Sequence, residues 1–152
     1  MGMLCTLYAL SNQDALSLLS GNRQDQPHLL QSCELDKAWG AIHYLLSGSG
    51  KTSSEDPTPQ EFLVSGQVLA DISENVALHM PQEVIDFAAT IRTHSSEDLI
   101  ARFDAARMNE LAVYGSPWDE SGLEYVRQFL DAFRAFVLDA AERRLAVLIV
   151  TA

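Results

Sequence analysis

The chain has 152 residues, of which 47% are hydrophobic, and its 10 basic and 21 acidic residues give a formal net charge of −11. A chain near about 150 residues forms one domain and buries roughly 68–70% of its unfolded surface, so we expect a single domain over residues 1–152. The negative charge is spread evenly, with −6 in residues 1–76 and −5 in residues 77–152. No basic region is present to bind phosphates, which argues against nucleic-acid binding.

The first predicted elements are a strand and two helices. Residues 3–10 form a short, nearly continuous apolar run, typical of a strand covered on both faces. Ser11 is a capping residue before a helix that ends at Gly21. After a polar loop that extends to about Glu34, apolar residues at helical spacing predict a second helix over residues 35–47.

The middle of the chain predicts shorter elements. Thr58 is followed by proline, glutamine and glutamate, a capping pattern that predicts a short helix ending near Gly66. Residues 76–80 are our choice for a third strand. Pro81 opens a further helix, and Ser95 caps the next one.

The last third of the chain predicts a long helix and a final strand. Asp104 can cap one more turn, and a capping box at Ser121 precedes the longest helix, over residues 122–143. The apolar, β-branched run 145–150 predicts the last strand. Together these elements predict an α+β fold, in which a small mixed sheet includes both terminal strands and is covered by five to six helices.

Cysteine content and hydropathy exclude several classes of protein. Two cysteines, Cys5 and Cys33, are too few for a disulfide framework and lack C-x-x-C spacing. No apolar stretch reaches the roughly 18–20 residues of a membrane span, and no basic residue precedes the first apolar run. We therefore expect a cytoplasmic protein that does not bind membranes. The histidines lack metal-ligand spacing and no complete catalytic or phosphate-binding motif is present, so neither a metal site nor a cofactor is predicted.

The first candidate site combines three side chains of the predicted helix 35–47. A helix turns about 100° per residue, so Asp36, Trp39 and His43 lie along one border of its apolar arc. A carboxylate that orients an imidazole can tune it as an acid or base, and an indole beside the pair suits the wall of a cleft. The alternative is structural: Trp39 packs in the core, and Asp36 and His43 form a hydrogen bond at its rim.

A second candidate site lies around the stretch broken by Gly115 and Pro117. Arg107, Tyr114 and Trp118 bring large polar and aromatic side chains to this irregular backbone, and loops held on a rigid scaffold often carry binding residues. The alternative is that Tyr114 and Trp118 fill the core beneath the loop. We treat these side chains as candidate ligand-binding residues and assign no catalytic residue.

Four segments spread over nearly the whole chain carry a resemblance to a known family: residues 1–11, 35–46, 103–108 and 140–149. The segment 35–46, with the pattern L-D-K-A-W-x-x-I-H-Y-L-L, is the most specific. On these segments the chain resembles the YfbM-like family, a bacterial family of unknown function with a single α and β domain. The resemblance implies a small soluble bacterial protein and no particular activity. It includes Asp36, Trp39 and His43 in the family pattern.

Three functions remain open at the level of sequence. The one we favour is a non-enzymatic binding or protein-interaction domain, since an acidic surface suits a basic protein partner, as in an inhibitor or immunity protein. The alternative is a small-molecule sensor or enzyme with a cleft bordered by Asp36, Trp39 and His43, in which His43 acts as acid or base. The third is a structural unit of a homo-oligomer. Ligand, oligomeric state and strand order are left open.

Overall fold

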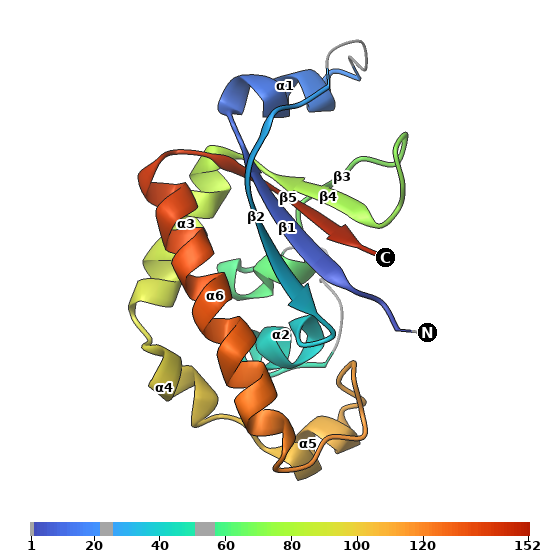
Figure 1. Ribbon diagram of the computed structural model, residues 1–152, viewed down its shortest axis with the longest axis vertical. Helices are drawn as coiled ribbons and strands as arrows, with labels where there is room; N and C mark the ends of the chain where they lie inside the picture. The colour runs from blue at the N-terminus through green and yellow to red at the C-terminus, as the bar shows by residue number, and fades with distance from the viewer. Residues whose placement is uncertain (1, 22–25, 51–56) are drawn as a thin grey trace.

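The computed structural model describes residues 2–21, 26–50 and 57–152. Its centre is a five-stranded sheet in which every neighbouring pair of strands is antiparallel (Figure 1). The strands lie in the order β2 (Leu29–Asp36), β1 (Cys5–Leu10), β5 (Ala146–Thr151), β4 (Val76–His79) and β3 (Gln67–Val68). The two terminal strands are therefore neighbours at the centre of the sheet.

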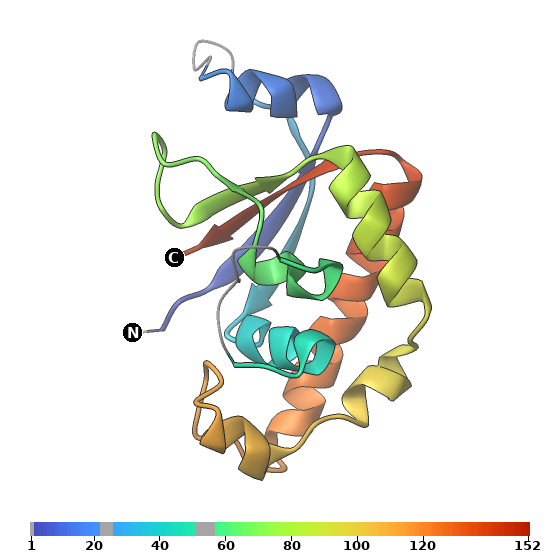
Figure 2. The ribbon, with the colours of Figure 1, turned by 180° about the vertical axis from the view of Figure 1, so that it is seen from behind.

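Besides the strands, the described part of the chain contains six α-helices and one 3₁₀ helix, η1. They are α1 (Asn12–Leu19), α2 (Trp39–Ser47), η1 (Pro59–Val64), α3 (Pro81–Arg92), α4 (Ser96–Ile100), α5 (Ala105–Glu110) and α6 (Gly122–Glu142). Figures 1 and 2 show α2, η1, α3 and α6 on one side of the sheet, with α1 at the far end. This one-sided helical layer leaves part of the sheet near the chain termini without a helix above it.

Alternation along the central strands creates the two cores. Leu7 and Ile149 face each other across β1 and β5 and belong to the larger core beneath α2, α3 and α6. Leu10 and Leu148 point to the opposite face and pack with α1 in a smaller core. Because side chains alternate strictly between the faces of a sheet, apolar residues at successive positions are required here, and burial of each large one contributes about 1.5–3 kcal/mol.

The predicted α+β class and the shared sheet of the two terminal strands are confirmed. The sheet is antiparallel throughout rather than mixed. Caps predicted from local spacing are also present: the Ser11 side chain accepts from the Asp14 amide, and Thr58 begins η1 with a capping box. The capping box predicted at Ser121 is absent, because the Ser121 hydroxyl donates to Asp119 instead.

The segment before α2 differs most from its predicted structure. Residues 29–36 form strand β2, where a polar loop was expected, and α2 begins at Trp39 instead of residue 35. In this edge strand only Cys33 and Leu35 are buried, so most of its residues are exposed and read as a loop. Asp36 then adopts φ 49°, a left-handed conformation that ends the strand.

Both cysteines are buried free thiols beneath the helical layer. Burial raises the pKa of Cys5 to about 12 and that of Cys33 to about 11. Since the thiolate is the reactive form, neither side chain is activated for nucleophilic or redox chemistry at neutral pH.

Among the described residues, no helix combines the length and apolar character that crossing a membrane requires.

Candidate functional site

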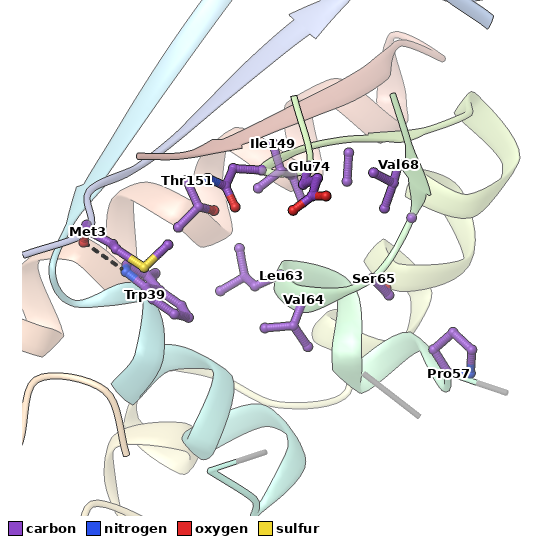
Figure 3. Close-up of a pocket in the computed structure, with 13 residues that line it drawn as sticks. Met3, Trp39, Pro57, Leu63, Val64, Ser65, Val68, Glu74, Ile149 and Thr151 are labelled. Atoms are coloured by element: carbon purple, nitrogen blue, oxygen red, sulfur yellow. Dashed lines mark hydrogen bonds between the residues drawn. The ribbon is translucent and has the colours of Figure 1, made fainter. Parts of the chain in front are cut away.

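A groove of about 520 Å³ opens on the helical side of the sheet, where β4 and β5 face η1 (Figure 3). Its volume falls in the range of about 300–1,000 Å³ that is typical of ligand sites. Large apolar side chains from the N-terminus, α2, η1 and the sheet line it: Met3, Trp39, Leu63, Val64, Val68 and Ile149. The groove lies where the helical layer ends, so apolar side chains of the sheet stay accessible.

Trp39 forms one end of the groove and is held by two contacts. Its indole Nε1 donates to the carbonyl oxygen of Met3 at 3.1 Å (Figure 3). Its ring stacks on Tyr114, with ring centroids 4.7 Å apart and 20° between the planes. The Tyr114 hydroxyl in turn accepts from the Met3 amide, so both the carbonyl and the amide of Met3 are hydrogen-bonded.

The ionisable side chain of the groove comes from the turn between two strands of the sheet. Glu74 is the only charged residue among the described residues that line the groove, beside Asn75 and Thr151. It lies in the turn between β3 and β4, where the amides of Ile72 and Ser73 both donate to the Leu69 carbonyl. In Figure 3 its carboxylate lies above the groove, across from Leu63 and Val64.

The η1 helix forms the wall opposite the sheet, and a histidine of β4 holds it. Nε2 of His79 lies 2.7 Å from the Phe62 carbonyl oxygen, and its Nδ1 lies 3.0 Å from Oε2 of Glu83 in α3. The imidazole is 3% exposed and stacks on the Phe62 ring at 4.1 Å. The hydrogen bond from His79 lowers the pKa of Glu83. His79 thus connects η1 to the sheet directly and to α3 through Glu83.

Asp36 supports the turn that precedes Trp39. Oδ2 of Asp36 accepts from the Tyr125 hydroxyl at 2.9 Å, and that hydroxyl oxygen accepts from the Lys37 amide at 3.2 Å. Burial and the bond to Asp36 raise the pKa of Tyr125, so its hydroxyl stays protonated and can donate. Asp36 therefore stabilises the turn from β2 into α2. It does not line the groove.

His43 lies apart from Asp36. It is 3% exposed within α2, and its Nε2 lies 3.4 Å from the hydroxyl oxygen of Ser47 one turn later. The expected border of a single helix does not form, because Asp36 belongs to a strand and only Trp39 and His43 are helical. Of these three candidates, Trp39 reaches the groove.

The second candidate cluster divides in the same way. Tyr114 contacts Trp39 and so supports the groove. Trp118 is fixed elsewhere, with its amide donating to Oδ1 of Asn109 at 2.6 Å and its ring edge-on to Phe103. Arg107 pairs with Glu110 at 3.1 Å on the surface. Neither Arg107 nor Trp118 lines the groove.

Several groove residues were not predicted from the sequence. Glu74 comes just before the strand predicted at residues 76–80, Val64 lies in the predicted short helix that ends near Gly66, and Thr151 lies just beyond the predicted strand 145–150. One signal was present: Glu74 and Asn75 come directly before a predicted strand, where a turn places polar side chains at the edge of a sheet. Among the described residues, no group of three or more His, Cys, Asp or Glu side chains is arranged to hold a metal ion.

The fold and the groove define a single-domain α+β protein with an apolar cavity at the open end of its helical layer. The family described as "Domain of unknown function (DUF1877)" matches residues 1–150, and the chain belongs to this family. A protein of unknown function, YfbM from Escherichia coli, has a similar structure, with a TM-score of 0.65 and 18% sequence identity over 98% of this chain and 99% of that chain. Comparison with curated proteins found no match.

Proposed function

We propose that this protein is a non-enzymatic binding domain whose groove takes an apolar, basic peptide segment of a protein partner. The observation that carries the proposal is the composition of the groove wall, which is apolar except for a few polar side chains and the carboxylate of Glu74. Apolar walls favour the burial of large aliphatic or aromatic side chains. Glu74 favours a lysine or arginine beside them.

The charge of the whole chain supports the same partner. A net charge of −11 attracts a basic segment and repels an acidic one, which raises the association rate and disfavours acidic competitors. Trp39 adds a flat aromatic surface at the groove end, and aromatic residues are enriched where protein interfaces are most strongly desolvated.

The arrangement of polar side chains favours binding over catalysis. The acid–base pair that the enzyme alternative requires is occupied elsewhere, since Asp36 bonds to Tyr125 and His43 contacts Ser47. Trp39, which that alternative also uses, lines the groove, and no histidine is among the described residues that line it. The apolar side chains that line the groove with Trp39 favour contact with a ligand and cannot transfer protons.

The test compares two designed peptides by fluorescence anisotropy. Both contain the same leucine and phenylalanine residues, and one carries lysines where the other carries glutamates. We expect the lysine peptide to bind and Glu74→Gln to weaken its binding about two- to fivefold, as for a partly exposed ion pair. Glu120→Gln, which removes the same charge from an exposed site outside the groove, is the control.

Two results would contradict the proposal. One is equal binding of the lysine and glutamate peptides. The other is an equal effect of Glu74→Gln and Glu120→Gln, which would mean that only the overall charge matters and that the groove is not the site.

A further inference from the structure

The contacts of His79 require a particular number of protons on its ring. The Phe62 carbonyl can only accept a hydrogen bond, so Nε2 must carry a proton at its distance of 2.7 Å. An ionised carboxylate also only accepts, so Nδ1 needs a second proton to bond Glu83 at 3.0 Å. The contacts on both sides are therefore those of a positively charged imidazolium.

Loss of one proton removes one of the two bonds. The bond to the Glu83 carboxylate involves an ionised acceptor, and such bonds are roughly twice as strong as bonds between neutral groups. The remaining proton is therefore retained on Nδ1, and the Phe62 carbonyl loses its donor. Because Phe62 directly precedes Leu63 and Val64, this loss falls on the helix that forms the groove wall.

We propose that protonation of His79 fixes η1 against β4 and α3, and that the groove binds more tightly in this protonated state. The second half of this inference rests on the proposed function, and the first half does not. Small shifts of η1 matter because Ser65 and Gly66, which follow it, line both the groove and the small cavity beside His79.

The described charged groups that face His79 are carboxylates. From α3, Glu83 bonds to it and Asp86 lines the same small cavity. From η1, the Glu61 carboxylate accepts from the Thr58 amide at 2.8 Å. From the neighbouring strand β5, the residue paired with His79 is the apolar Val147. The described surroundings thus present carboxylates and no cation to the ring.

The sign of the pH dependence follows from both partners. Glu83 has a lowered pKa, so its contribution to stability is present above its unfolded value and is lost only as pH falls through the lowered one. On the basic side, imidazoles ordinarily lose their proton between about pH 5 and 8. Because the two contacts of His79 need a proton on each ring nitrogen, the proposal predicts that loss of one ring proton weakens the contact to η1.

The first measurement is amide hydrogen exchange of residues 61–66 in the unliganded protein at about pH 5.5 and about pH 8.5, below and above the ordinary imidazole pKa of about 6.5. We compare protection factors and not exchange rates, because a protection factor is already corrected for the pH dependence of the intrinsic exchange rate. We expect protection to fall about three- to tenfold at the higher pH, as for the loss of one hydrogen bond.

Glu83→Gln is a matched variant in which protection of residues 61–66 should not depend on pH. In Glu83→Gln the amide can donate to an unprotonated Nδ1, so Nε2 keeps its proton for Phe62, and glutamine also preserves the capping contact to the Met80 amide. Protection should then stay high at both pH values. His94→Gln, at a histidine in a different part of the fold, should keep the wild-type response.

The second measurement is the affinity of the lysine peptide at the same two pH values, which we expect to be about three- to tenfold weaker at the higher pH. Unchanged protection of residues 61–66, or a wild-type pH response in Glu83→Gln, would overturn the inference that protonation of His79 fixes η1. Equal affinity at both pH values would overturn the inference that the groove binds more tightly in the protonated state. Absence of binding at either pH, with a normal exchange response, would instead overturn the proposed function. If Glu83→Gln does not fold, His79→Gln, which is always neutral, should show no pH response in residues 61–66.

Discussion

At the scale of single residues, the segment around residue 36 positions the Trp39 side chain at the groove. Asp36 ends β2 in a left-handed conformation, its carboxylate is bound by Tyr125, and Trp39 then enters α2 facing the groove. The sequence pattern placed Asp36, Trp39 and His43 on one border of a helix, and of these three only Trp39 lines the groove. It could not predict the partner of Asp36, because Tyr125 lies 89 positions away along the chain.

Tyr125→Phe tests this reading of the turn. It removes the hydroxyl that bonds both Asp36 and the Lys37 amide, so we expect a loss of about 1–2 kcal/mol of stability, which lowers the Tm by about 2–8 °C for a domain of this size. Calorimetry measures the shift. Tyr8→Phe is the control, because the described residues provide no hydrogen bond to the hydroxyl of Tyr8, and an equal shift in both variants would contradict this role.

At the scale of elements, the helices that begin with a local cap were predictable and the edge strand was not. Ser11, Ser95 and Asp104 each accept from the amide three residues later, a contact that depends only on short spacing. Strand β2 depends on pairing with β1, which no local pattern carries. The boundary at Trp39 was missed for the same reason.

Arginine side chains also fix helix ends across long sequence separations. Nε of Arg134 in α6 donates to the His94 carbonyl oxygen at 3.2 Å, just beyond the end of α3, and its Nη2 lies 3.5 Å from the carbonyl oxygen of Ile91. A cation at a helix C-terminus also complements the helix dipole. The structure therefore ties the long helix to α3 by polar contacts as well as by apolar packing.

Arg134→Met keeps the apolar stem and removes these donors. We expect a loss of about 1 kcal/mol and a Tm lower by about 2–4 °C. Arg143→Met, at a surface arginine 3.3 Å from Asp139, should change the Tm much less. Thermal unfolding of both variants provides the comparison, and a larger decrease in Tm for Arg143→Met would contradict the role given to Arg134.

At the scale of the whole molecule, the groove exists only because distant segments meet. Its walls run from Met3 to Thr151, and the sheet order that brings these ends together follows from pairings among five strands. Hydrophobic patterning predicted that both termini share one sheet. It could not predict strand order or the open end of the helical layer, since each depends on contacts between segments far apart in sequence.

The most direct test of the groove as the binding site is chemical-shift mapping with the lysine peptide. The two tryptophans provide an internal comparison, because Trp39 lines the groove and Trp118 does not. We expect the peptide to shift the indole N–H signal of Trp39 and the amides of Val64 and Thr151, and to leave the indole signal of Trp118 unchanged. Shifts centred on Trp118, with Trp39 unaffected, would contradict the account.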